Sequence, residues 1–245
     1  MENFIILFFV GLAAGFLNVM AGGGSTLTLP VLIFLGLDSA TANGTNRIAI
    51  IIQNISAILS FRKEKYSKFK ISLKLALFTL PGAVIGALAA VKMSDALFQK
   101  ILAVVMIGVV ISMILPRKKI ENENPEGELS WKIYAAMFGI GFYGGFIQVG
   151  VGFLLMAALL YLMKLNLVFV NMHKVFIVLI YTIPALFIFA YSGNVNWLLG
   201  LTLAAGNAAG AWQAAKLSVK KGEKAVRFVL IAAIIIMAMK LLNVF

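Results

Sequence analysis

The residues best suited to chemistry in this sequence lie where a long apolar segment is interrupted. The interruption is Gly22-Gly23-Gly24, and Ser25 and Thr26, which follow it, are expected to cap a short helix. The N-terminus of a helix held in a low-dielectric bundle presents unpaired N–H groups and a positive dipole end, and both attract an anion. The sequence therefore predicts an anion site at this break. The alternative is that the three glycines only allow a tight re-entrant turn and close helix packing.

A second, weaker interruption occupies the corresponding place in the other half of the chain. It reads Gln148-Val149-Gly150-Val151-Gly152-Phe153 and offers one amide side chain, that of Gln148. Asn18 precedes the first break as Gln148 precedes the second, and it also carries an amide. We expect both amides to give a bound anion directional hydrogen bonds.

Each half also brings one permanent cation close to the start of a long apolar segment. Arg47 follows Asn43-Gly44-Thr45-Asn46, and Lys174 follows Asn171-Met172-His173. These cations either enter the bundle interior, where a buried charge is costly and usually functional, or extend to the lipid headgroups. His173 is either a titratable proton carrier or a hydrogen-bonded helix cap.

The acidic residues are informative by their positions. None of them falls within an apolar segment, so a cationic substrate would find no counter-charge there, and coupling to sodium or protons through a buried carboxylate is unsupported. The acids are Glu2, Asp38, Glu64, Asp95, Glu121, Glu123, Glu126, Glu128 and Glu223. An anion is therefore the predicted cargo.

The predicted substrate-binding residues combine the break glycines with polar side chains and cations. They are Asn18, Gly22, Gly23, Gly24, Ser25, Asn43, Asn46, Arg47, Gln148, His173 and Lys174. Replacing Arg47 with Ala is predicted to abolish anion binding while preserving assembly. We predict no catalytic residue, metal site or cofactor, because the chain has no cysteine and a single histidine.

The elements that must position these residues are membrane segments. Of the 245 residues, 62% are hydrophobic and 12% are charged, whereas about 25% of residues are charged in soluble domains. The mean hydropathy is +1.02, and the chain has room for roughly ten spans of about 20 residues. Such a bundle argues against nucleic-acid binding, so the net charge of +12 is interpreted as an orientation signal.

Ten apolar segments can be marked, five on each side of a polar linker. The second segment of each five has ten or eleven residues, too few for a bilayer core that needs about 17 to 25, so each is expected to turn back inside the membrane. The approximate bounds are residues 4–20, 26–35, 48–61, 71–91, 98–115, 131–149, 153–163, 170–191, 197–215 and 225–244. The predicted domains are a first transmembrane repeat at residues 1–116, a cytoplasmic linker at 117–130 and a second, inverted repeat at 131–245.

Matching residues in the two halves indicate an internal duplication. An offset of 130 places Gly11, Gly15, Asn18 and Gly22 on Gly141, Gly145, Gln148 and Gly152, an offset of 128 places Asn43 on Asn171, and an offset of 124 places Gly82 and Gly86 on Gly206 and Gly210. The pairs Gly11 with Gly15 and Gly141 with Gly145 are expected to let helices pack closely. The predicted fold is an all-α, polytopic membrane helical bundle with two inverted-topology repeats, each with a re-entrant or broken-helix hairpin.

Charge predicts how this bundle sits in the membrane. The loop at residues 62–70 is strongly basic while its counterpart at 192–196 has no charge, and the bias reverses for the loops at 92–95 and 216–227. An odd number of segments per half inverts the second half, which puts both basic loops and Arg117-Lys118-Lys119 on one face, expected to be cytoplasmic. The prediction is a multi-pass protein of the cell inner membrane with both termini extracytoplasmic.

Several motifs of the first half point to a known family. Gly22-Gly23-Gly24, Pro30, Gly36 and the Ala-Asn-Gly-Thr-Asn string at residues 42–46 resemble the TauE/SafE sulfite exporter family of bacterial and archaeal membrane permeases. The resemblance covers essentially the whole chain. It implies an inverted-repeat bundle with intramembrane hairpins that transports sulfite, sulfoacetate or related sulfonates.

The second half departs from the pattern of that family. Members often repeat the glycine run and a Gly-Thr-Asn/Ser string, whereas this chain has Gly150-Val151-Gly152-Phe153 and Asn171-Met172-His173-Lys174 at those places. A lysine and a histidine where small polar residues are commoner add positive charge. This suits a substrate with a sulfonate and a second acidic group.

The leading functional hypothesis is a secondary carrier that exposes one anion site alternately to the two sides of the membrane as its halves rock. No Gly-x-x-x-x-Gly-Lys-Ser/Thr loop appears in the sequence, so a gradient is the expected driving force. The expected partners are a small anionic solute and the lipid bilayer, with no nucleic acid, and a homo-oligomer stays open. The alternatives are a passive anion channel or scaffold, and an intramembrane serine hydrolase that uses Ser25 and His173.

Overall fold

The computed structural model of the protein describes residues 2–114 and 129–218, and within these ranges every regular element is a helix. The predicted all-α class is therefore confirmed. The tenth predicted segment, at residues 225–244, and almost all of the predicted linker lie outside the described residues. The helices are α1 (Glu2–Met20), α2 (Ser25–Phe34), α3 (Ser39–Lys63), α4 (Phe69–Val91), α5 (Asp95–Ile114), α6 (Trp131–Phe146), α7 (Val151–Tyr161), α8 (Leu167–Tyr191) and α9 (Trp197–Ser218).

The long helices α3 and α8 begin earlier than the apolar pattern suggests. The side chain of Asp38 accepts a hydrogen bond of 3.0 Å from the Thr41 N–H group and starts α3, and Asn166 accepts one of 3.1 Å from the Phe169 N–H group and starts α8. Arg47 therefore lies about 12 Å along its helix at a rise of 1.5 Å per residue. Of the two alternatives for His173, the helix cap is wrong, because His173 lies inside α8, whose N-cap is Asn166.

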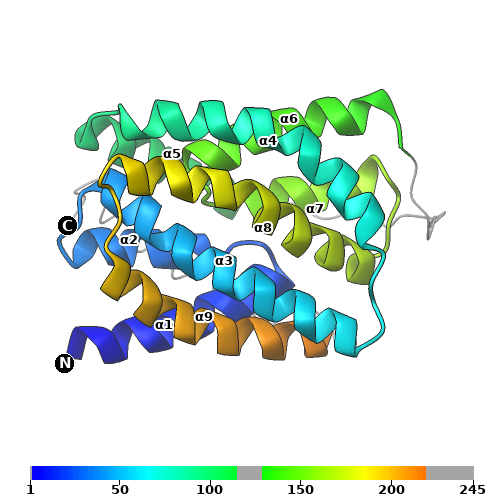
Figure 1. The fold of residues 1–245 in the computed structure, drawn as a ribbon, viewed down its shortest axis with the longest axis horizontal. Coiled ribbons are helices and arrows are strands. Elements are labelled where there is room, and N and C mark those ends of the chain that lie inside the picture. The colour runs from blue at the N-terminus through cyan, green and yellow to red at the C-terminus, as the bar shows by residue number, and fades with distance from the viewer. Residues whose placement is uncertain (1, 115–128, 219–245) are drawn as a thin grey trace.

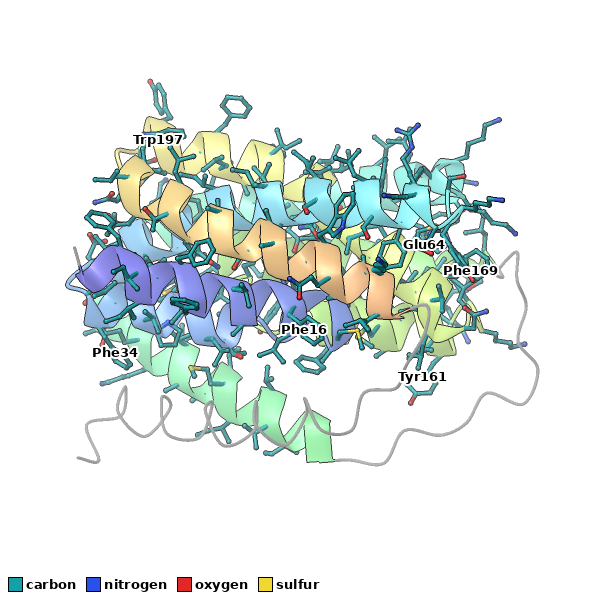
Figure 2. All side chains as sticks on the ribbon, turned by 90° about the horizontal axis from the view of Figure 1, so that it is seen from below. Phe16, Phe34, Glu64, Tyr161, Phe169 and Trp197 are labelled. Carbon is teal, nitrogen blue, oxygen red and sulfur yellow. The ribbon has the colours of Figure 1, made fainter. Side chains whose placement is uncertain are left out.

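The short helices α2 and α7 have 10 and 11 residues, which is less than the 17 or so that a bilayer core requires. Each follows a longer helix and folds back toward the end of the bundle from which that helix came. The hairpin of α1 and α2 starts and finishes at the end marked by Phe34 and Trp197, whereas the hairpin of α6 and α7 starts and finishes at the end marked by Tyr161, Phe169 and Glu64 (Figures 1 and 2).

Glycines determine how closely the outer helices pack. Helix α1 packs on α9 and α4 packs on α6, with α3 and α8 between these pairs (Figure 1). A Cβ atom added at Gly15 would overlap the backbone of Asn207 in α9, and one added at Gly145 would overlap the backbone of Ala83 in α4. The packing role expected of these glycine pairs is therefore confirmed.

The two outer pairs repeat the same contact register. Gly206 and Gly210 of α9 face the backbone of α1 at residues 8–16, and Gly82 and Gly86 of α4 face the backbone of α6 at residues 138–146. These contacts are related by the offsets of 124 and 130 that the sequence indicates.

Within the described residues, two helices are long and apolar enough to cross a membrane by length and composition alone, α4 and α8. Charge gathers at one end of the bundle. Arg62 and Lys63 in the last turn of α3 and Lys65 in the loop after it lie at the end marked by Glu64, whereas the loop at 192–196, next to Trp197, is uncharged (Figure 2). The predicted orientation stays a prediction.

Candidate functional site

The two glycine-containing breaks meet each other inside the bundle. Gly22 has a left-handed backbone, with φ of 86°, and a Cβ atom added to it would lie 2.6 Å from the carbonyl carbon of Gly152. Gly152 in turn faces the Cα, C and O atoms of Gly22. No side chain fits at either position, because backbone occupies the space on both sides.

The local structure of each break explains its sequence. Helix α1 ends with Gly22 N–H donating to Asn18 O at 3.0 Å. The N-cap residue of α2 is Gly24 and not Ser25 or Thr26, so the expected side-chain cap is wrong, and the Thr26 hydroxyl donates instead to Gly23 O. In the second break, Gln148 and Gly150 have φ values of 60° and 74°.

A small polar cavity lies where the breaks meet the central helices. Its volume is about 10 Å³, which is room for about one water molecule. Helices α1, α2, α3, α7 and α8 and the second break all contribute to the wall. The lining residues are Asn18, Ser25, Gln53, Asn54, Gln148, Val151, Gly152, Lys174, Val175 and Val178.

The electrostatics of this cavity favour an anion. Ser25 is the first residue of α2, and Val151 and Gly152 are the first two of α7, so both short helices point their N-termini at the cavity. Each N-terminus carries roughly half a positive charge, although part of its first turn is already paired, since Thr26 N–H donates to Gly23 O and Phe153 N–H donates to Gly150 O. Among the described side chains, the carboxylates lie elsewhere, at outer helix ends: Asp38, Glu64 and Asp95.

Lys174 supplies a full positive charge to the cavity wall. Its side chain is 2% exposed and reaches across from α8 to the C-terminal end of α1. The ammonium group donates to Val19 O and to Asn171 Oδ1, both at 2.9 Å. The ammonium therefore sits opposite the negative end of α1, beside the positive end of α2.

Arg47 occupies a related place at the end of α6 but does not line the cavity. Its guanidinium donates to Gly144 O at 3.2 Å, to Gly145 O at 2.5 Å and to Gln148 Oε1 at 2.8 Å, and it lies 4.7 Å from the centre of the Phe189 ring. Arg47 is fully buried, so it and Lys174 both enter the bundle interior and neither extends to the headgroups. Within the described part of the chain, the hydrogen bond to Gln148 connects Arg47 to the cavity wall.

Amide side chains complete the wall. Gln53 Oε1 accepts hydrogen bonds of 3.2 Å from the amide groups of both Asn18 and Asn207. Asn54 donates to Ile50 O at 2.8 Å within α3. Gln53 and Asn54 are absent from the predicted site. Their position in the middle of an apolar segment is the sequence feature that could have identified them as site residues, because polar residues there are usually functional.

The structure brings together four of the predicted side chains, those of Asn18, Ser25, Gln148 and Lys174. Gly22 lies beside them through its contact with Gly152. The other polar residues lie outside the wall. Asn43 donates to Phe146 O at 2.8 Å, Asn46 accepts from the Thr28 hydroxyl at 2.7 Å, and His173 Nδ1 lies 2.7 Å from Ser72 Oγ. The structure thus pairs His173 with Ser72 and not with Ser25.

A helical bundle with two broken helices around a polar cavity is typical of membrane transporters. The chain belongs to the sulfite exporter TauE/SafE family, whose model matches residues 7–241. It is 30% identical over 240 residues to the "Probable membrane transporter protein YfcA" of Escherichia coli, covering 97% of this chain and 88% of the relative.

Further relatives have similar descriptions. A "Probable membrane transporter protein" of Haemophilus influenzae is 27% identical over 224 residues, covering 91% of this chain and 88% of the relative. The "Probable membrane transporter protein YunE" of Bacillus subtilis is 28% identical over 241 residues, covering 88% of this chain and 87% of the relative. No solved structure matches the chain.

Proposed function

We propose that this protein is a secondary transporter that moves a small anion across the membrane by alternating access. One observation carries the proposal: the N-termini of α2 and α7 and the ammonium group of Lys174 converge on one buried polar cavity. Such an arrangement attracts negative charge, and the hydroxyl of Ser25 and the amides of Gln53 and Asn54 offer directional hydrogen bonds.

Sulfite or an organosulfonate such as sulfoacetate is the proposed substrate. The family is described as that of a sulfite exporter. The cavity is small and polar, which suits a compact oxyanion better than a large apolar ligand.

Alternating access is proposed from the relation between the two halves of the chain. The hairpin of α1 and α2 enters the bundle from one end and that of α6 and α7 from the other (Figures 1 and 2). Left-handed residues recur at an offset of 128, at Gly22 and Gly150, at Gly36 and Lys164, and at Lys65 and Gly193. These features support two inverted-topology repeats, which would rock against each other around the cavity.

We further propose that the protein lies in the cell inner membrane with the loop at 62–70 in the cytoplasm. The basic residues of that loop support this orientation, because positive charge is enriched in cytoplasmic loops. Both termini would then be extracytoplasmic. A small anionic solute and the bilayer are the proposed partners.

The function can be tested in liposomes that contain the purified protein. Vesicles preloaded with unlabelled sulfite should take up labelled sulfite faster than unloaded vesicles, and the rate should saturate. Uptake that grows linearly with concentration and ignores the preload would indicate the passive anion channel instead. A complete lack of uptake of sulfite, sulfoacetate and methanesulfonate would contradict the proposal.

A further inference from the structure

Among the described residues, four buried hydrogen-bond donors lack a partner in this conformation. They are Ser39 Oγ, at the first position of α3, and Asn46 Nδ2, Arg47 Nε and Tyr181 Oη, all on side chains that are at most 1% exposed. Buried donors without partners are rare in native proteins, because each costs the desolvation of a polar group. A second conformation that satisfies them would explain why the chain retains them.

Helices α3 and α8 define which residues of the two halves correspond. Both have 25 residues, and they begin at Ser39 and Leu167, an offset of 128. The left-handed residues that precede and follow them, Gly36 with Lys164 and Lys65 with Gly193, have the same offset. No insertion therefore separates the two helices along their length.

This offset relates three of the four partnerless donors to residues of the cavity wall, whereas Ser39 corresponds to Leu167, which lies outside that wall. Asn46 corresponds to Lys174, and Arg47 corresponds to Val175. Tyr181 corresponds to Gln53, which also lines the cavity. Asn46, Arg47 and Tyr181 are thus the counterparts, in the other half of the chain, of residues that line the cavity in this conformation.

We propose that Asn46, Arg47 and Tyr181 form a second anion-binding wall, which faces the cavity when the transporter opens to the other side of the membrane. This inference rests on the proposed alternating-access function. If the two repeats exchange conformations, residues equivalent to the present wall become the new wall. An oxyanion held there accepts hydrogen bonds from the Asn46 amide, the Arg47 guanidinium and the Tyr181 hydroxyl.

Gln148 connects the two walls. It lines the present cavity and accepts a hydrogen bond from Arg47 Nη1 at 2.8 Å. Its amide nitrogen also lies 3.3 Å from Thr182 Oγ1, the residue next to Tyr181. Rotation of α3 relative to α6 would break the hydrogen bond between Arg47 and Gln148 and bring the guanidinium toward the anion. Lys174 would move away from the anion and keep its hydrogen bond to Val19 O.

Cysteine accessibility tests this second wall directly, because the natural chain contains no cysteine. Val178 lines the present cavity, and Ile50, its counterpart at the same offset, does not. Val178→Cys and Ile50→Cys would be placed separately in vesicles of uniform orientation and treated with a charged, impermeant thiol reagent from either side. We expect the two cysteines to react from opposite sides, each at least tenfold more slowly with saturating methanesulfonate, a sulfonate that does not consume the thiol reagent as sulfite would.

Labelling of both cysteines from one side, or no labelling of Ile50→Cys while Val178→Cys reacts, would overturn the second wall. Sulfite uptake by the same vesicles measures the transporter function separately. If the vesicles take up sulfite but either of these labelling results is found, the second wall alone is contradicted. Vesicles without uptake contradict the transporter and the second wall together.

Tyr181→Phe gives an independent test that does not depend on a reactive thiol. Removal of the hydroxyl should raise the KM for sulfite several-fold at one face of the membrane and leave the KM at the other face unchanged. Tyr143→Phe is the matched control, because the Tyr143 hydroxyl already has a partner in Val149 O, and it should not produce a one-sided change. Unchanged KM values at both faces in Tyr181→Phe, with a higher melting temperature, would overturn the role of Tyr181.

Discussion

The ammonium group of Lys174 in α8 donates a hydrogen bond of 2.9 Å to the carbonyl oxygen of Val19, the penultimate residue of α1. Arg47 of α3 makes the related contact with the carbonyl oxygens of Gly144 and Gly145 near the end of α6. Each broken helix is therefore held at its negative end by a cation from the other half of the chain. The positive ends of α2 and α7 stay available to an anion.

Arg47→Ala should destabilise the protein as well as impair transport. The substitution leaves the carbonyl groups of Gly144 and Gly145 and the Gln148 side chain without their charged donor. Hydrogen bonds to charged groups contribute about 1.5–3 kcal/mol each, so we expect a melting temperature lower by several degrees in detergent. The contacts thus revise the sequence-based expectation that Arg47→Ala preserves assembly. A variant with wild-type thermal stability would show that these contacts contribute little.

Gly141→Ala should disrupt the packing of α6 on α4. A Cβ atom at this position would overlap the backbone of Thr79, and forced overpacking costs about 1–3 kcal/mol. Gly139→Ala is the matched control two residues away, since none of the other described helices comes within 4 Å of its added Cβ. Melting curves of the two variants check the prediction, and equal stabilities would mean that the helices separate easily.

Two substitutions of Gln53 should separate its effect on stability from its effect on the charge of the cavity wall. Gln53→Leu removes the acceptor shared by Asn18 and Asn207, and each unpaired amide costs about 1–3 kcal/mol, so the melting temperature should fall. Gln53→Glu keeps the acceptor but adds a negative charge to the cavity wall. We expect Gln53→Glu to fold and to bind sulfite at least about tenfold more weakly, or about 1.4 kcal/mol. Wild-type affinity in Gln53→Glu would place the anion elsewhere.

Local patterns predicted the helices, the breaks and the glycine contacts because each depends on few neighbouring residues. The start of α3 was misjudged for a physical reason. Residues 39–47 are mostly polar or small, so they do not extend the apolar run, yet Asp38 caps the helix and the polar side chains find partners in other helices. Buried polar residues of this kind are satisfied by tertiary contacts, which local hydropathy does not contain.

The choice between the two cations also depends on tertiary structure. Arg47 stands one position after the counterpart of Lys174, and one residue rotates a side chain by about 100° around a helix. This rotation turns Arg47 toward α6 and Phe189, while Lys174 faces the cavity. The sequence identifies both cations as interior candidates, but only the packing of α3 and α8 determines which one lines the site.

The most direct test of the account is a calorimetric titration of the purified protein with sulfite, comparing the wild-type protein with Lys174→Met and Lys132→Met. Lys132 is exposed near the start of α6 and does not line the cavity, and its loss changes the net charge equally. We expect sulfite to bind the wild-type protein and Lys132→Met with the same affinity and Lys174→Met at least tenfold more weakly. Equal affinities in all three proteins would contradict an anion site at the junction of the two broken helices.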